Sequence, residues 1–391
     1  MTTSSAELAE LAEAREELRA VARALLSKTR PPATPGWSVL AASGWLGLEV
    51  PADLDGAGAT FAEVAVIAEE LGRAVACGPY LGSTVLGVGT LRELTASPES
   101  DDLLRQTAAG EALPVAVLAD GTPATRQATA DGVPFWLAKT PGGGVRLHGQ
   151  AAFVPDAAQA TSLLMLARAT HDSAPVIVAV DPHAAGITID AQPVVDETRQ
   201  FAQVTAGGAE IAPAAIWRFA EDPRAAVRRL QDRAAVTVAC DSLGVAEAML
   251  DATVSYAKVR EQFGRPIGSF QAVKHACADM FVQVTVSRQL ITSAVTAIAA
   301  AAPAPAGTVS AGTVSASTAA GGTAATIAAA MAKSYACDAA VEVAGKAMQL
   351  HGGIGYTWES GIHRYLKRAA LNRSLFGSPA DYRRRLAARY R

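Results

Sequence analysis

The 391-residue chain lacks the features that mark several broad classes of protein. Its first residues contain no basic segment followed by an apolar stretch, so we expect no secretion signal. No uninterrupted apolar run reaches the ~18 residues that a membrane span requires, and no span is predicted. A formal net charge of -3 without a long basic stripe argues against nucleic acid as a partner. These absences favour a cytoplasmic protein.

Cysteine is scarce, and the common catalytic and cofactor fingerprints are missing. The spacing of the four cysteines fits neither a CxxC metal site nor a disulfide framework, so we expect reduced thiols. There is no GxGxxG after a strand, no GxxxxGK[ST], no HExxH and no GxSxG. The six histidines form no ligand pair, and we predict no metal site.

The spacing of apolar residues divides the chain into three regions. Helical spacing dominates the first ~110 residues, for example at 6–27 and 61–77. Short β-rich runs separated by turn residues begin near 113, and long helical patterns return near Pro223. We therefore predict an N-terminal helical domain (1–110), a central β domain (111–216) and a C-terminal helical bundle (217–391).

One segment within the last region has a different composition. Residues 300–326 contain no charge and no large side chain, and the unit AGTVS occurs twice in tandem. Such a segment buries too little surface to offset its ordering entropy. We expect a mobile loop between two helices.

The stretch from Tyr256 to Met280 carries the first group of candidate binding residues. Arg260 offers a rigid fork of donors suited to a pyrophosphate. Gln262 can hydrogen-bond a ribose or phosphate, and Phe263 offers a ring face for an adenine. Taken alone, Arg260 is more simply explained as one half of a surface ion pair.

The stretch from Gln349 to Glu359 carries the second group. Gly352 and Gly353 allow a backbone to approach an anionic ligand, because no Cβ stands in the way. Taken alone, a glycine pair usually indicates only a turn.

Together, the two stretches resemble those of the acyl-CoA dehydrogenases. The matching motifs are R-x-Q-F-G-x-x-I-G-x-F-Q (Arg260 to Gln271), A-D-M (Ala278 to Met280), Q-x-x-G-G-x-G-Y (Gln349 to Tyr356), G-W-L-G-L-E-V-P (Gly44 to Pro51) and E-E-L-G-R-A (Glu69 to Ala74). The resemblance covers nearly the whole chain.

This resemblance implies a fold, a cofactor and an assembly. The fold is an N-terminal α-helical domain, a central β domain and a C-terminal four-helix bundle. The family forms tetramers and binds FAD and an acyl-CoA substrate. One subunit holds the flavin ring in its β domain, and the bundle of its neighbour holds the ADP end. The ADP-binding positions correspond to Arg260, Gln262, Phe263, Gln349, Gly352 and Gly353.

The sequence departs from the family where a catalytic base is needed. The family reaction removes an α-proton from the acyl thioester, which requires a carboxylate. Counting without gaps places Phe376 at the usual Glu position and Ala234 at the alternative position on the first bundle helix. Neither side chain can accept a proton. Asp232 and Asp241 are near Ala234 but do not occupy its position, and for Asp232 the offset of two residues rotates a helical side chain by ~200°.

The β domain departs from the family as well. The expected Y-x-x-T-E-P segment is not recognisable in 113–122. The expected W-I-[TS] segment aligns with Phe153-Val154-Pro155, and proline has neither an N–H nor a hydroxyl to offer. The ring-binding half of a flavin site is therefore predicted to be eroded, while the ADP-binding half is predicted to be intact.

Some family members are heteromers in which one subunit type has lost the base, notably in actinobacterial steroid side-chain degradation. Two runs, 196–199 (DETR) and 361–369 (GIHRYLKRA), resemble that subunit type. The leading hypothesis is therefore a base-lacking subunit that completes the FAD site of a second acyl-CoA dehydrogenase subunit. One alternative is a self-sufficient dehydrogenase or oxidase with a base relocated to Asp232 or Asp241. The other is a flavin-free scaffold on the same fold.

Overall fold

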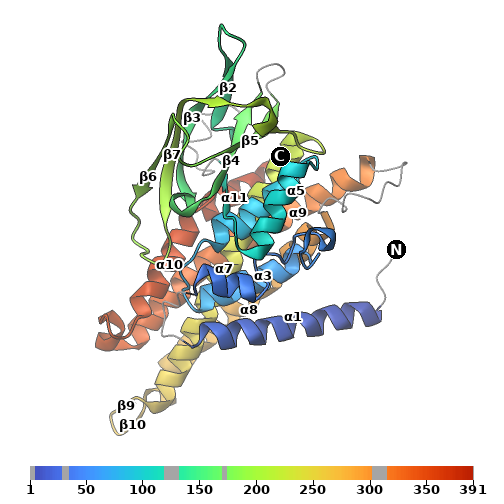
Figure 1. Cartoon of the computed structure of the whole chain (residues 1–391). Helices are drawn as coiled ribbons and strands as arrows, with labels where there is room; N and C mark the ends of the chain where they lie inside the picture. Colours follow the sequence, from blue (N-terminus) through green and yellow to red (C-terminus); the bar gives the residue numbers. More distant parts are fainter. Residues whose placement is uncertain (1–4, 29–34, 119–131, 170–173, 302–314, 391) are drawn as a thin grey trace.

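The computed structural model describes residues 5–28, 35–118, 132–169, 174–301 and 315–390, which form helical, β and helical parts in chain order (Figure 1). The first part contains five α-helices and a π-helical segment, η2. These are α1 (Ser5–Leu26), α2 (Trp37–Ala42), α3 (Phe61–Arg73), η2 (Tyr80–Val88), α4 (Gly89–Arg92) and α5 (Pro98–Ala109). A capping box at Thr60 begins α3, because the Thr60 side chain and Glu63 satisfy the first free N–H groups.

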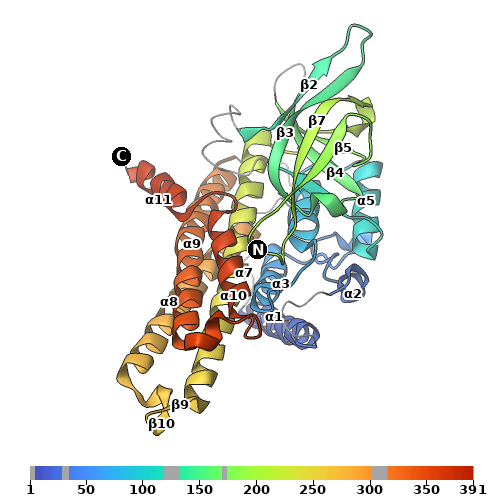
Figure 2. The same ribbon diagram turned by 90° about the vertical axis from the view of Figure 1, so that its left-hand side faces the viewer.

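The central part is one eight-stranded sheet that stands above the helices (Figure 2). Its strands are β1 (Pro114–Val117), β2 (Phe135–Lys139), β3 (Val145–Pro155), β4 (Ser162–Arg168), β5 (Pro175–Val180), β6 (Ile187–Gln192), β7 (Phe201–Ile211) and β8 (Ile216–Trp217). The order is β6-β7-β3-β2-β4-β5-β8, with β1 paired to β4. Most neighbours are antiparallel, but β1 and β2 run parallel to β4.

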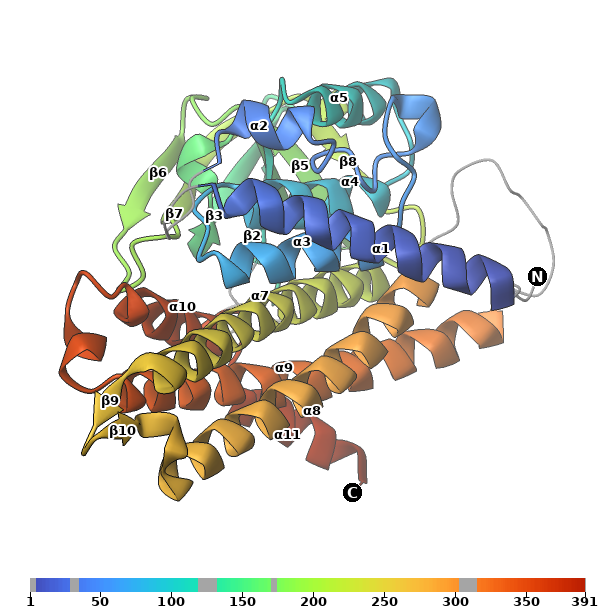
Figure 3. The ribbon, with the colours of Figure 1, turned by 90° about the horizontal axis from the view of Figure 1, so that it is seen from below.

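The last part is a bundle of long helices (Figure 3). Its helices are α7 (Pro223–Val259), α8 (Gln271–Ala301), α9 (Ser315–Leu350), α10 (Ile362–Ser374) and the short α11 (Pro379–Ala387). A small hairpin, β9 (Glu261–Gln262) with β10 (Arg265–Pro266), joins α7 to α8 at one end of the bundle. The predicted architecture, with a β domain between two helical parts, is confirmed.

The expected loop at 300–326 is wrong over its second half. Helix α9 begins at Ser315, so 315–326 are helical, and Ala325 is buried. Alanine is the strongest helix former, and α9 gains tertiary contacts with α7 that composition does not reveal. Residues 302–314 lie outside the described part of the chain.

Close contact between α3 and α7 explains one of the N-terminal motifs. A Cβ at Gly72, within E-E-L-G-R-A, would lie 2.0 Å from the carbonyl oxygen of Asp241. A Cβ at Gly244 would lie 1.9 Å from the carbonyl oxygen of Glu69. Only glycine permits the two backbones to approach this closely.

One described helix, α8, is long and apolar enough to cross a membrane by length and composition alone. This is weak evidence, because core helices of soluble proteins pass the same test. In this fold α8 packs against α7 and α9 and leaves Phe281 and Val282 exposed.

Candidate functional site

The two predicted binding stretches meet at the β9–β10 end of the bundle. The ring of Tyr256, on the last turn of α7, stacks on His351 with centroids 4.4 Å apart. Its hydroxyl also donates to the carbonyl of His351 at 3.5 Å. Arg260 follows Tyr256 by one helical turn, and Gly352 follows His351 directly. Tertiary packing therefore brings the two motifs together.

The side chains at this end are presented to solvent. The six predicted cofactor-binding residues are all exposed: Arg260, Gln262, Phe263, Gln349, Gly352 and Gly353. We call these six residues the dinucleotide motif. Within the described chain Arg260 has no ion-pair partner, so the surface ion pair that would explain it otherwise is not found. Phe263 is 91% exposed and contacts Phe270 edge-on.

The backbone of the dinucleotide motif is open to a ligand. Gly352 has a φ of +62°, and a Cβ built there or at Gly353 would meet nothing within 4 Å. By contrast, a Cβ at Gly355 would lie 2.4 Å from the carbonyl oxygen of Met348. The first two glycines are thus not required by internal packing, and they leave room for an anionic group beside an unpaired guanidinium.

The segment aligned with W-I-[TS] has a different geometry. A β-bulge interrupts the β3–β7 ladder between Ala151 and Val154, and Phe153 takes a φ of +51°. The backbone N–H of Phe153 donates to Gln192 Oε1 at 2.6 Å. Pro155 is buried and pairs with Phe201. This segment therefore offers no hydroxyl, and the N–H of Phe153 is already used. Residues 119–122 of the other predicted ring-contacting segment lie outside the described chain.

The end of β3 packs against η2 and is hydrogen-bonded to it. Asp156, with a φ of +63°, accepts a hydrogen bond from the backbone N–H of Gly82 at 2.8 Å. Burial raises the pKa of Asp156 to about 6 despite this bond. A Cβ at Gly82 would lie 2.4 Å from the carbonyl oxygen of Pro155. The Pro155–Asp156 turn is therefore packed tightly onto the N-terminal domain.

The two usual base positions hold no proton acceptor. Phe376 is half-buried, packs on the main core and has a φ of +56°. Its carbonyl accepts a hydrogen bond from the Tyr382 hydroxyl at 2.9 Å. Ala234 is buried on α7. Phe376 thus keeps an uncommon left-handed backbone conformation although its side chain has no acid–base chemistry.

Asp241 and Asp232, the two carboxylates considered as a relocated base, differ in how many hydrogen bonds they accept. Asp241 accepts from Arg368 at 2.9 Å, from Arg199 at 2.7 Å and from Asn372 at 2.6 Å. Burial acts to raise the pKa of Asp241, but the two arginines and the amide outweigh it and hold the pKa below its usual range. A carboxylate so fully bonded is a poor proton acceptor. Asp232 has one described hydrogen bond, from the Thr326 hydroxyl at 2.6 Å, and points toward α9 instead.

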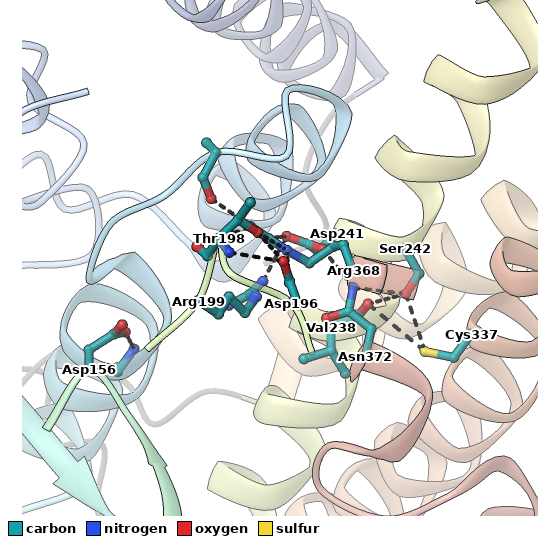
Figure 4. Close-up of polar contacts among 12 residues, drawn as sticks. Asp156, Asp196, Thr198, Arg199, Val238, Asp241, Ser242, Cys337, Arg368 and Asn372 are labelled. Atoms are coloured by element: carbon teal, nitrogen blue, oxygen red, sulfur yellow. Dashed lines mark hydrogen bonds and ion pairs between the residues drawn. The ribbon is translucent and has the colours of Figure 1, made fainter. Parts of the chain in front are cut away.

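Asp241 belongs to a buried polar cluster that joins all three parts of the chain (Figure 4). Arg368 on α10, 1% exposed, donates to Asp196 at 2.7 Å and to Thr198 at 2.6 Å. It also donates to the carbonyl of Ala76 in the N-terminal domain at 2.7 Å. We call this cluster the junction network: Asp196, Thr198, Arg199, Asp241, Arg368 and Asn372. It brings together the two runs, 196–199 and 361–369, whose sequences resemble the base-lacking subunit type.

Comparison with known proteins gives the family. A model of the acyl-CoA dehydrogenase N-terminal domain matches residues 7–111, and a model of the C-terminal domain matches residues 224–390. The chain belongs to the acyl-CoA dehydrogenase family. Members of this family use FAD, which fits the exposed dinucleotide motif.

Two relatives and two solved structures are similar to the chain over most of its length. The chain is 31% identical to acyl-CoA dehydrogenase IpdE2 of Mycobacterium tuberculosis over 94% of this chain and 90% of that protein. The counterpart in Mycolicibacterium smegmatis is 29% identical over 87% and 83%. A variant of the Tcur3481–Tcur3483 steroid ACAD aligns with TM-score 0.77 and 27% identity, over 97% of this chain and 98% of that one. The ChsE4–ChsE5 complex of M. tuberculosis aligns with TM-score 0.79 and 25% identity, over 96% of each. Of these four, the Tcur3481–Tcur3483 structure is described as a steroid ACAD.

Sequence reasoning missed several buried polar residues of this acyl-CoA dehydrogenase. Lys333 is fully buried, donates to the carbonyls of Asn372 and Arg373 and so caps the C-terminus of α10. Burial lowers the pKa of Lys333. The sequence signal was that Lys333 is the first charged residue after a long uncharged, alanine-rich stretch.

Proposed function

We propose that this chain is the base-lacking subunit of a heteromeric, FAD-dependent acyl-CoA dehydrogenase. It lends the ADP-binding half of a flavin site to a partner subunit, which supplies the catalytic base and the flavin-ring pocket. The contrast between the two ends of the flavin site carries this proposal. The dinucleotide motif is exposed and its Arg260 has no ion-pair partner in the described chain, whereas the ring and base positions hold Pro155, Phe376 and Ala234.

The residues present fit the dinucleotide end of FAD and not its ring. Arg260 would pair with the pyrophosphate, Gln262 and Gln349 would hydrogen-bond polar groups beside it, and Phe263 would cover the adenine. Gly352 and Gly353 would let the backbone approach the phosphates. When bound, FAD accepts the hydride removed from the β-carbon of the acyl thioester. This chain's own share is to hold the cofactor and, through the junction network, to keep the bundle rigid.

The acyl group and the partner belong to the same proposal. Two structural neighbours pair different subunits, and one of these two is described as a steroid ACAD. We propose a steroid-derived acyl-CoA as the substrate class and a second acyl-CoA dehydrogenase chain as the partner.

The test is co-expression with the product of a neighbouring gene, followed by absorbance and chain quantification. We expect one flavin for every two chains in the complex and flavin-poor protein when this chain is expressed alone. A yellow homomer with one flavin per chain and acyl-CoA-dependent reduction would contradict the proposal. It would instead favour a self-sufficient enzyme with a relocated base.

A further inference from the structure

A cavity of about 500 Å³ lies at the end of α7 opposite the dinucleotide motif. Its walls come from the N-terminal third of α7, α4, the end of α8, the start of α9 and the C-terminal Arg389. Asp232 lines it and is separated from Arg260 by 28 residues of α7, or ~42 Å at 1.5 Å per residue. Its volume falls within the ~300–1,000 Å³ of small-molecule sites. It is therefore separate from the flavin-binding end.

The cavity combines apolar walls with arginines. Phe61, Leu230 and Ile298 supply apolar surface from three different helices. Two wall arginines are fully occupied, because Arg229 pairs with Glu93 and Arg233 pairs with Glu49. These ion pairs form part of the cavity wall, and their arginines have few N–H donors left for a ligand.

Two other arginines keep donors free. In the described chain the partner of Arg228 is Asp222, at 3.9 Å, and both side chains are mostly exposed. Arg389 donates to the carbonyl of Thr323 at 3.4 Å. An arginine has five N–H donors, so most of the donors of this pair remain available to an anion.

Asp232 places a titratable group in the same wall. Burial raises its pKa to about 6, and the Thr326 hydroxyl, Arg228 and Arg389 act in the opposite direction. Asp232, Arg228 and Arg389 all line the same cavity. The other charged wall groups are Arg92, Glu93, Glu221, Asp222, Arg229 and Arg233. The described walls from α8 and α9 carry no titratable side chain.

We propose that this cavity binds a small amphiphilic monoanion, an apolar chain or ring system with one carboxylate-like end. The apolar body would contact Phe61, Leu230 and Ile298, and the anionic end would lie between Arg228 and Arg389. An ionised Asp232 repels that end, whereas a protonated one does not, so binding strengthens as the pH falls through about 6. Cavity volume limits the ligand to roughly 17 non-hydrogen atoms, taking ~30 Å³ for each as for a water molecule.

Decane-1-sulfonate is the probe, because it stays ionised throughout the pH range, and decan-1-ol is its uncharged counterpart. We expect calorimetric titration of the full-length protein, as purified with or without its partner, to show sulfonate binding that is about tenfold tighter at pH 5.5 than at pH 7.5. Decan-1-ol should bind more weakly and without pH dependence.

Three variants separate this site from general apolar binding. The double variant Arg228→Gln/Arg389→Gln should weaken sulfonate binding roughly tenfold or more. Asp232→Asn should tighten it at pH 7.5 and remove its pH dependence, while Arg105→Gln, an exposed arginine on α5, should change nothing. Sulfonate binding that is absent at pH 5.5, or unchanged in the double variant, would overturn the proposal. Neither result would affect the flavin half-site, which lies at the other end of α7.

Discussion

The junction network and the dinucleotide motif differ in whether their charged side chains are buried and paired. In the junction network, Arg368 and Asp241 are buried and each charge is met by a partner from another part of the chain. In the dinucleotide motif, Arg260 is exposed and has no ion-pair partner in the described chain. Removing one partner from the junction network would leave a buried charge uncompensated. An unpaired arginine at an open, glycine-lined surface is instead a candidate ligand contact.

The largest expected effect comes from breaking the junction network. Arg368→Met removes the cation and leaves Asp196 and Asp241 buried without it. We expect a loss of ~3–5 kcal/mol in the free energy of unfolding, measured by urea denaturation. Arg373→Met on the same helix is the control, because this half-exposed arginine pairs with Asp338 at the surface and should cost less than ~1 kcal/mol. Equal effects would show that burial of the network does not matter.

The stability of Arg368→Met should depend on pH differently from the stability of the wild type. The pKa of Asp241 is lower in the folded chain than in the unfolded one, so its stabilising contribution is present above about pH 4 and is lost as the pH falls through the folded pKa. Arg368 is the strongest of the groups that lower this pKa, so we expect the pKa to rise without it, and the variant then loses less stability than wild type on acidification. We expect the stability gap between wild type and Arg368→Met to narrow between pH 7 and pH 4. A gap that stays constant would exclude Asp241 as the coupled group.

Breaking the dinucleotide motif should leave stability alone and weaken flavin binding. Arg260→Ala should reduce flavin affinity of the co-purified complex by roughly ten- to a hundred-fold, because the pyrophosphate loses a charged donor. Lys258→Ala, two residues away and also exposed, should have little effect. Flavin retention on dilution and gel filtration measures both. If Arg260→Ala retains flavin like wild type, the cross-subunit assignment is wrong.

Restoring a carboxylate at the usual base position should not restore dehydrogenase activity. Phe376→Glu in the isolated chain supplies a base position but no ring-binding group at Phe153–Pro155, so we expect no acyl-CoA-dependent reduction of an artificial electron acceptor. A Glu packed against the core would also tend to keep its proton. Turnover by this homomer would show that the ring-binding half is not eroded.

The smallest effect is expected between α8 and α9. Replacing 302–314 by a short Gly/Ser linker should leave the melting temperature nearly unchanged, since loop-closure entropy varies slowly with length. Extending the replacement through 326 should lower it measurably, because Thr326 bonds Asp232 and Ala325 is buried. If both replacements behave alike, the first turns of α9 contribute nothing to stability.

Local pattern alone determined much of this protein. The switch from helical spacing to short β-rich runs and back indicated the three-part fold, because burial of one face imposes a period on each element. Through their resemblance to acyl-CoA dehydrogenases, the motifs around Arg260 and Gly352 predicted the cofactor, and the residue types at 376 and 234 predicted that a base is missing. These properties depend on residue type and spacing.

Tertiary structure decided the environment of the charged residues and the start of α9, which the spacing of residues along the sequence does not predict. Only packing joins Asp196 to Arg368 across 172 positions and turns Asp241 from a candidate base into one half of a buried ion pair. Only packing extends α9 back to Ser315, where an uncharged alanine-rich sequence predicted a loop. The environment of a charge, and so its pKa and its role, is set by distant residues that folding brings within hydrogen-bonding distance.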